Sequence, residues 1–325
     1  MNRIVKTSDK ERKMIFETAA SKLKIPVEMI EKDFWVCWTL NKLFSNKHLA
    51  SILRFKGGTS LSKVFHLIKR FSEDIDLILD WRCVTSDDPF EKRSNSKQDL
   101  FNKDIQNSSG DYISTTLCQM ISDAMENECS VSVDSKDPHV LLVKYPESFP
   151  KSYITPHIKL EIGPLASWVP NDNFDIETYV GEALPELKIP KFNIPVILAE
   201  RTFWEKVTIL HQEHHRPEHL NVPLRYSRHY YDLFMMCRAD FFEKVLANLD
   251  LLKAVVEFKK KFYPRGWARY DLAVPGSIKL SPAPHSEKAL REDYKAMRNM
   301  IFGDYPSWDE ICQKLNSVEV KINKF

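Results

Sequence analysis

Two adjacent glycines constrain this sequence more than any other feature. Only 8 of the 325 residues are glycine, and Gly57 and Gly58 stand together between an apolar run at 52–55 and a stretch with helical spacing. Without side chains they allow a ligand to approach the backbone, and the start of the following helix presents free N–H groups. Such a junction suits a phosphate, although a plain tight turn contains the same pair.

A pair of aspartates follows one helix later. Asp74 and Asp76 flank Ile75 in an apolar run that predicts a strand over 75–79. Side chains two apart in a strand project from one face, so both carboxylates lie together while Ile75 and Leu77 enter the core. Like charges this close repel unless a cation lies between them, and Mg²⁺ favours one or two carboxylates plus substrate phosphates. The pattern indicates a site for Mg²⁺, with Mn²⁺ as an alternative ion, or else a solvated strand end.

The two features together are more specific than either one alone. A phosphate-binding turn, a helix and a D-x-D strand resemble the polymerase-beta-like nucleotidyltransferase superfamily, in which a neighbouring strand supplies a third carboxylate. The run at 158–162 alternates apolar and polar residues and places Glu161 on the polar face of such a strand. We expect Glu161 to be the third metal ligand, with Glu128 and Asp134 as alternatives.

Over most of its length the sequence resembles the AbiEii/AbiGii (MenT-like) family of toxin nucleotidyltransferases, the toxic halves of abortive-infection and toxin–antitoxin systems. The likeness is carried by segments in the family's order, which are 31–36, 55–63 with 71–77, 201–206, 228–233, 269–276 and 293–297. The polar stretch at 83–112 and the five prolines within 164–196 match no motif of that family. We expect the polar stretch to be a mobile insertion and the proline-rich one to wrap the surface.

The resemblance implies a nucleotide site in the N-terminal half of the chain. Asp74 and Asp76 would hold Mg²⁺ against a nucleoside triphosphate. The residues that would surround the phosphates are Gly57, Gly58, Thr59 and Ser60. Ser72 stands where some family members are phosphorylated by their antitoxin. A phosphate there would add negative charge beside two carboxylates and repel the substrate.

The resemblance also implies two roles in the C-terminal half. Lys206 would neutralise charge on the triphosphate, and Asp232 would orient that lysine or assist the acceptor. The residues alone are equally compatible with simpler roles. Lys206 lies off the apolar stripe of its helix, as a surface lysine would, and Arg228 is four residues before Asp232, as in an intrahelical ion pair.

The order of the expected elements predicts an α+β fold. Helices precede a mixed β-sheet core flanked by helices, and a mainly helical C-terminal domain follows. We place the nucleotidyltransferase core at 1–196 and the helical domain, which would complete the active site, at 197–325. Further strands are expected at 130–134, 139–144 and 157–162. A helix capped by Thr59 or Ser60 is expected to run to about Lys69, and further helices are expected at 197–215, 224–238, 240–262 and 286–301.

Composition limits the compartment and the partners. Charged residues make up 28% of the chain and hydrophobic residues 43%, which is typical of a folded globular protein. No run approaches 18 apolar residues, no secretory leader is apparent, and the six cysteines lack zinc-type spacing. We therefore expect a cytoplasmic protein that does not enter a membrane.

The function predicted from the sequence is a metal-dependent nucleotidyltransferase toxin held in check by an antitoxin protein. By resemblance the acceptor is RNA, and the 3′ end of tRNA is the best candidate. Residues 251–325 carry 14 lysines and arginines against 9 acidic residues. The run 259–270 interleaves basic residues with aromatic residues, a composition that suits RNA binding. The same run is compatible with a helix end whose aromatic residues lie in the core. The alternatives are modification of a protein or small molecule, or nucleotide binding without turnover.

Overall fold

The computed structural model describes residues 1–149, 155 and 157–325. Within them the chain forms two compact units, each made of two separate stretches of sequence. The first unit comprises Met1–Val64 and Ser72–Ile197, and the second comprises Phe65–Phe71 and Leu198–Phe325. The second unit therefore includes Phe65–Phe71, a segment that lies within the predicted core of residues 1–196.

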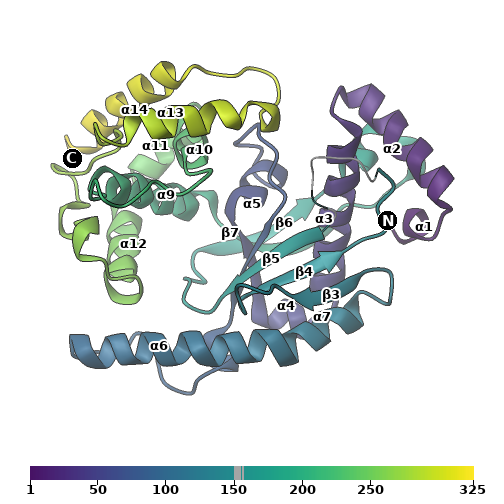
Figure 1. The fold of residues 1–325 in the computed structure, drawn as a ribbon, viewed down its shortest axis with the longest axis horizontal. Coiled ribbons are helices and arrows are strands. Elements are labelled where there is room, and N and C mark those ends of the chain that lie inside the picture. Colours follow the sequence, from purple (N-terminus) through teal and green to yellow (C-terminus); the bar gives the residue numbers. More distant parts are fainter. Residues whose placement is uncertain (150–154, 156) are drawn as a thin grey trace. The chain divides into compact units, whose positions relative to one another are not determined.

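A seven-stranded mixed sheet forms the centre of the first unit, in the order β3-β4-β5-β2-β1-β7-β6 (Figure 1). β2 runs parallel to β5 and β1 runs parallel to β7, whereas the other neighbouring pairs are antiparallel. The strands are β1 (Leu53–Lys56), β2 (Ile75–Leu79), β3 (Ser130–Val133), β4 (Val140–Lys144), β5 (His157–Gly163), β6 (Asn171–Ile176) and β7 (Phe192–Ile197).

The central strands have the alternation that their sequences predict. In β5 the aliphatic side chains are buried, while Lys159 and Glu161 are exposed. In β2, Ile75 and Leu77 are buried on either side of the half-buried Asp76. In both strands the aliphatic face lies in the core, and the opposite face presents charged side chains at Asp76, Lys159 and Glu161.

Eight helices are assigned among the described residues of the first unit. They are α1 (Asn2–Val5), α2 (Asp9–Leu23), α3 (Val27–Ser45), α4 (Lys47–Ile52), α5 (Gly57–Lys63), α6 (Asn95–Tyr112), α7 (Cys118–Ala124) and α8 (Tyr179–Ala183). α3 packs against β5 and β7 of the sheet and against α2 (Figure 1). α2 begins at a capping box, in which Ser8 and Glu11 each accept a backbone N–H of the other residue.

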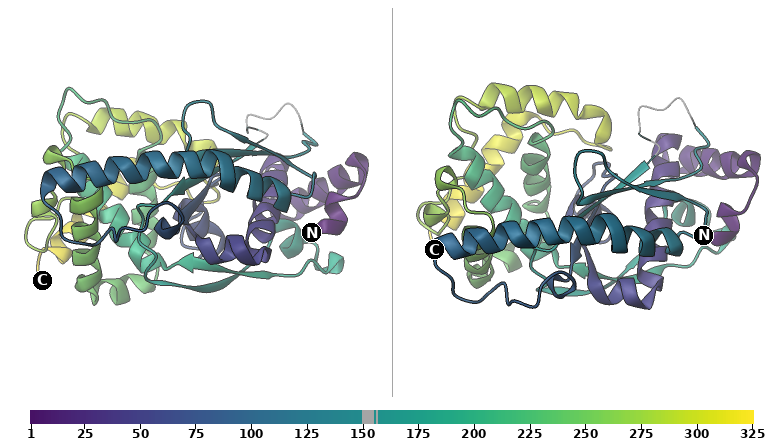
Figure 2. Two further views of the ribbon diagram at one scale, coloured as in Figure 1. Left: turned by 90° about the horizontal axis from the view of Figure 1, so that it is seen from below. Right: turned by 60° about the horizontal axis from the view of Figure 1, so that its bottom comes forward.

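The prediction of a mobile insertion at 83–112 was wrong. Ser94 caps α6 by accepting from the N–H of Lys97, and the helix then buries Gln98, Phe101 and Ile105 at spacings of three and four. α6 continues through a π-helical segment, Ile113–Leu117, into α7, and Figure 2 shows the three as one long rod. Polar composition concealed a narrow but regular apolar stripe.

The proline-rich stretch 164–196 was also predicted incorrectly in part. It supplies β6, α8 and β7, and β7 lies inside the sheet between β1 and β6 although it contains Pro195. The contact with β1 is short and is registered at Phe55 and Val196. A strand with so little pairing on one side tolerates a proline, which cannot donate to a ladder.

The second unit is built from helices (Figure 1). They are α9 (Ala199–His214), α10 (Ser227–Met236), α11 (Phe241–Leu246), α12 (Leu249–Phe262), α13 (Glu287–Ala296) and α14 (Trp308–Ile322). α9 packs against α10 and α12, and α10 packs against α13 and α14. The helix predicted over 240–262 is two helices, because α11 ends at Leu246 and Asn248 then caps α12 by accepting from the N–H of Leu251.

Residues 65–71 do not continue α5, which ends at Lys63 rather than near Lys69 as expected. Their backbone instead pairs with the segment after α13. The N–H of Phe71 donates to Met300 O at 2.6 Å, and the N–H of Phe302 donates to Lys69 O at 2.8 Å. These hydrogen bonds anchor the segment before the D-x-D strand in the second unit.

The fold class predicted from the sequence is confirmed, with a mixed sheet flanked by helices followed by a helical C-terminal part. None of the helices in the described part of the chain is long and apolar enough to cross a membrane.

Candidate active site

The junction between β1 and α5 is a tight backbone turn that begins a helix. Gly57 is its first helical residue and has a φ of +86°, which a residue with a side chain rarely adopts. The hydroxyl of Ser60 donates to Gly57 O at 2.8 Å, and the hydroxyl of Thr59 donates to Asp74 O at 2.5 Å. Both hydroxyls are buried and hold the junction and the start of β2 together. Their contact with phosphates stays a prediction.

Gly57 is also required by what lies against it. A Cβ at this position would meet Asp76 Oδ2 at 1.8 Å and Asp76 Cγ at 2.4 Å. The backbone of the turn therefore approaches the carboxylate of Asp76 as closely as a glycine allows. A ligand held by the turn would lie beside that carboxylate.

Three charged residues form a row across the sheet beside this turn. Asp76 on β2 is the register partner of Lys56 on β1 and of Glu161 on β5. Register partners project from the same face, so the row presents a cation and two carboxylates together. Asp74 lies just before β2 and is half-buried, as Asp76 is. The prediction that Glu161 belongs to a strand neighbouring the D-x-D strand agrees with this geometry.

The two alternatives to Glu161 lie elsewhere. Asp134 follows β3, which is three places from β2 in the sheet, and its carboxylate accepts from the N–H groups of Lys136 and Asp137 in a turn. Glu128 precedes β3. Glu161 is therefore the glutamate that the strand order brings beside Asp76.

The donor set of the row fits a hard divalent cation. Mg²⁺ is usually held by one or two carboxylates together with waters and substrate phosphates. Asp74 and Asp76 supply two carboxylates, and Glu161 lies on the adjoining strand. Among the residues that the structure describes, no three His, Cys, Asp or Glu side chains are grouped closely enough to hold a metal ion by themselves. The residues fit an ion that shares its coordination with a phosphate.

The second unit contains a buried charge cluster that includes the other two predicted residues. Asp232 on α10 accepts from Lys206 Nζ of α9 at 2.8 Å, and from Arg70 through Nε at 2.6 Å and Nη2 at 2.8 Å. All three residues are buried, and Asp232 is fully enclosed. Lys206 is therefore no surface lysine, and Asp232 bonds outside its own helix. The predicted role of Asp232 in orienting Lys206 is compatible with this contact.

The two cations of the cluster stabilise the ionised form of Asp232. Burial alone would raise the pKa of Asp232, but Arg70 and Lys206 hold the pKa of that carboxyl well below its usual range. Burial lowers the pKa of Lys206, an effect that Asp232 opposes and Arg70 reinforces. Arg70 and Lys206 thus share the carboxylate of Asp232.

Sequence reasoning missed Arg70 and Lys56. Arg70 forms the bidentate contact to Asp232, a residue 162 positions away, and no local pattern could have connected them. Lys56 was visible in the motif but has meaning only through its register with Asp76. Ser72, the predicted phosphorylation position, is half-buried two residues before Asp74.

The basic and aromatic run at 259–270 divides between core and surface. Phe262 and Tyr270 are buried, and the hydroxyl of Tyr270 donates to Gln212. Tyr263 is 40% exposed, and the half-buried Trp267 lies against the guanidinium of Arg265 at 5.7 Å. Two of the four rings are thus core residues rather than surface ones.

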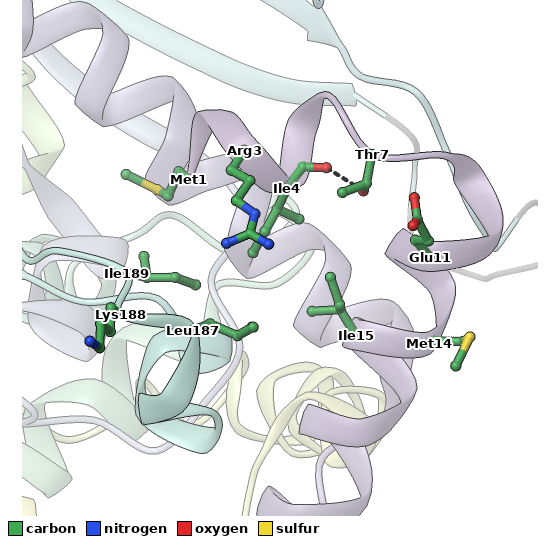
Figure 3. A pocket seen from close by; sticks show the side chains of 10 residues that line it. All are labelled: Met1, Arg3, Ile4, Thr7, Glu11, Met14, Ile15, Leu187, Lys188 and Ile189. Atoms are coloured by element: carbon green, nitrogen blue, oxygen red, sulfur yellow. Dashed lines mark hydrogen bonds between the residues drawn. The ribbon is translucent and has the colours of Figure 1, made fainter.

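A cavity of about 460 Å³ in the first unit is separate from all of these residues. It is lined by α1, the start of α2 and residues 187–189 (Figure 3). Apolar side chains such as Ile4 and Ile15 surround Arg3 there. Its lining contains no residue of the predicted site.

A Gly-Gly junction beside a D-x-D strand in a mixed sheet is the arrangement of a nucleotidyltransferase. A family model described as the nucleotidyl transferase AbiEii toxin of type IV toxin–antitoxin systems matches residues 38–314. The chain belongs to this AbiEii family, as its sequence motifs predicted. The comparison with curated proteins gives no match.

Two solved structures are similar to the chain. One is MenT4, a nucleotidyltransferase toxin from Mycobacterium tuberculosis H37Rv, with 17% identity, a TM-score of 0.45, and coverage of 94% of this chain and 97% of the other. The second is a protein from H. pylori assigned as a nucleotidyltransferase, with 15% identity, a TM-score of 0.41, and coverage of 91% and 96%.

The approach of Gly57 to Asp76 predicts a specific cost for Gly57→Ala. Alanine would be strained at the positive φ of this position, and its Cβ would displace the carboxylate of Asp76. We expect the free energy of unfolding to fall by roughly 1–3 kcal/mol, measured by urea denaturation. Gly163→Ala is the control, because a Cβ there meets nothing within 4 Å. Equal effects of the two substitutions would show that the close approach is absent.

The buried cluster predicts a larger cost for Asp232→Ala. Removal of the carboxylate leaves Arg70 and Lys206 as uncompensated buried cations, so we expect a loss of about 3–5 kcal/mol in urea denaturation at neutral pH. Because the folded-state pKa of Asp232 is depressed, its stabilisation is complete above the pKa of an unfolded aspartate and declines only at more acidic pH. Asp271→Ala removes an exposed ion pair with Arg269 that water and salt screen, so it should cost much less stability than Asp232→Ala. A loss no larger than that of the control would contradict the account of the cluster.

Proposed function

We propose that this AbiEii-family protein transfers a nucleotide from a nucleoside triphosphate to an acceptor hydroxyl, in a reaction that depends on Mg²⁺ or Mn²⁺. The observation that carries the proposal is the row of Asp76 and Glu161 beside the Gly57 turn. The turn would receive phosphates and the carboxylates would receive the cation that accompanies them. In the transfer, the acceptor oxygen forms a bond to the α-phosphorus, pyrophosphate leaves, and the hydroxyl proton passes to solvent.

Each residue has a defined task in this proposal. Asp74, Asp76 and Glu161 would hold the divalent cation, which when bound would offset the negative charge of the triphosphate. The backbone N–H groups of Gly57 and Gly58 would contact phosphate oxygens, because the hydroxyls after them already donate to carbonyls.

Lys206 would neutralise charge on the triphosphate, with its ammonium held in place by Asp232. Arg70 would help to fix Asp232 through its two hydrogen bonds. The cluster would thus contact the charge of the substrate, and the carboxylates of Asp74, Asp76 and Glu161 would hold the cation.

The acceptor that we propose is RNA, with the 3′ end of tRNA as the first candidate. The proposal rests on the family and on the basic character of residues 251–325, where Lys260, Arg265 and Tyr263 are exposed. Cations and an exposed ring are the groups that contact an unstacked RNA end. We also propose that an antitoxin restrains the activity, and Ser72 is the candidate position for phosphorylation.

Transfer can be measured with purified protein, each α-labelled nucleoside triphosphate in turn, Mg²⁺ and total tRNA. We expect one nucleotide to label tRNA, EDTA to abolish the labelling, and added Mn²⁺ to restore it. Asp74→Ala/Asp76→Ala should lower labelling roughly 100-fold or more, because charge stabilisation at the site is lost. The control Asp172→Ala/Asp175→Ala removes two exposed carboxylates from the edge strand β6 and should label as the unmodified protein does.

The alternative outcomes separate the competing functions. Label on a protein in place of tRNA would contradict the RNA acceptor but keep the transfer chemistry. Binding of the triphosphate with no label on any acceptor and no release of pyrophosphate would contradict transfer and favour a nucleotide-binding protein. Labelling that survives Asp74→Ala/Asp76→Ala would remove the carboxylates from the site.

A further inference from the structure

Three consecutive residues of α3, Glu31, Lys32 and Asp33, are charged and buried. Successive residues of a helix point about 100° apart, so the three side chains reach different parts of the first unit. Glu31 accepts from the N–H of Ser148 at 2.7 Å. Asp33 forms an ion pair of 2.6 Å with Lys63 at the end of α5. The helix therefore fixes its surroundings through charged contacts as well as through apolar packing.

Lys32, the middle residue of the three, contacts the segments that lead into β2 and β5. The ammonium of Lys32 donates to His157 O at 2.6 Å and to Thr155 O at 2.8 Å. It also lies 3.4 Å from the Glu73 carboxylate. The two carbonyls belong to the start of β5 and the residue two positions before it, and Glu73 lies two residues before β2. One side chain thus connects the entries of two neighbouring parallel strands.

These two strands carry the carboxylates of the proposed cation site. β2 and β5 pair with Ile75 opposite Leu160 and Asp76 opposite Glu161. Asp76 is three residues beyond Glu73, and Glu161 is four residues beyond His157. Because strands are stiff over so few residues, a fixed separation at the entries also fixes the separation of the two carboxylates.

Burying Lys32 has a free-energy cost that packing alone does not require. Its side chain is 0% exposed, and burial lowers its pKa, while Glu73, Asp74 and Glu31 oppose that shift. A methionine or leucine of similar volume would fill the space without desolvating a charge. A buried ammonium at this position is explained if its contacts with Thr155 O, His157 O and Glu73 fix the positions of the two strands.

We propose that Lys32 is a positioning residue that sets the spacing of Asp76 and Glu161 by tying the entries of β2 and β5 together. The inference rests on the proposed function, since it assumes that these carboxylates bind a divalent cation. Lys32 itself touches neither the cation nor the nucleotide. Its effect is transmitted through Glu73 and through the backbone of β5.

Positioning and simple electrostatics predict effects of opposite sign. A buried cation close enough to act on Asp74 repels a divalent cation, so loss of its charge alone should tighten metal binding. Loss of a positioning contact should weaken it, and changes behind metal ligands typically cost 10–100-fold in affinity. The sign of the change therefore identifies the role.

The test is direct binding of Mn²⁺ to the full chain, followed by electron paramagnetic resonance of the free ion, with and without a non-hydrolysable nucleoside triphosphate. We expect Lys32→Met to weaken Mn²⁺ binding about tenfold or more. Lys32→Arg retains the charge but cannot reproduce the three directions of an ammonium, so we expect weakened binding there as well. If Lys32→Met does not fold, Lys32→Arg decides the question.

Arg12→Met is the matched control. Arg12 is a buried cation of the first unit that donates to two backbone carbonyls, Val5 O and Thr7 O, as Lys32 does to two others. Its hydrogen bonds and ion pair within the described part of the chain are to Val5, Thr7, Asp9 and Ser148, all of which lie outside β2 and β5. Thermal denaturation should show a comparable loss of stability in both Met variants, whereas Mn²⁺ affinity should change only in Lys32→Met.

Two further results would overturn the inference in different ways. Unchanged or tighter Mn²⁺ binding by Lys32→Met, or an equal loss in Arg12→Met, would leave Lys32 a purely structural residue. Mn²⁺ binding that is unaffected by Asp76→Asn would instead remove the cation site, and with it the proposed function on which this role rests. The Asp76→Asn variant thus separates failure of the inference from failure of the proposal beneath it.

Discussion

The parallel pairing of β2 with β5 is the contact on which the account of this protein depends. It sets Asp76 beside Glu161 on one face of the sheet, where two carboxylates repel each other in the absence of a cation. Lys56 lies on the opposite side of Asp76, and the Gly57 turn lies against it. The row thus gathers a lysine and two carboxylates beside the turn, where a cation and a phosphate would be bound together.

Buried charged side chains outside the row contact the segments that carry it. Lys32 connects the entries of β2 and β5, and Asp33 holds Lys63 at the end of the helix that follows the glycine turn. In the second unit, Arg70 and Lys206 share the carboxylate of Asp232. Buried ion pairs contribute little net stability compared with apolar packing, but they fix distances and directions. In both units, buried ion pairs thus fix the positions of side chains, although removing these charges from water costs free energy.

Sequence patterns predicted the parts of this protein that depend on local information. Alternation identified β2 and β5, and the placement of Glu161 on a polar strand face followed from it. The capping box of Ser307 and Glu310, which begins α14, was equally readable but was overlooked. Polar composition concealed α6, and Pro195 concealed β7.

What the sequence could not supply is partnership across long separations. Arg70 acquires its meaning from Asp232, and Lys32 from Glu73 and the carbonyls of β5, which lie far away in the chain. The assignment of residues 65–71 to the second unit likewise depends on hydrogen bonds to residues 300 and 302. No periodicity or short motif encodes these pairings, because they arise only when the strands and helices are assembled.

The central claim is that Asp74, Asp76 and Glu161 form the cation site of a nucleotidyltransferase. The most direct measurement is a crystal structure with Mn²⁺ and a non-hydrolysable nucleoside triphosphate, in which anomalous scattering locates the metal. Mn²⁺ is expected within about 2.0–2.6 Å of oxygens from Asp74, Asp76, Glu161 and the triphosphate. A nucleotide bound with its metal away from these carboxylates, or at a site that does not include the Gly57 turn, would contradict it.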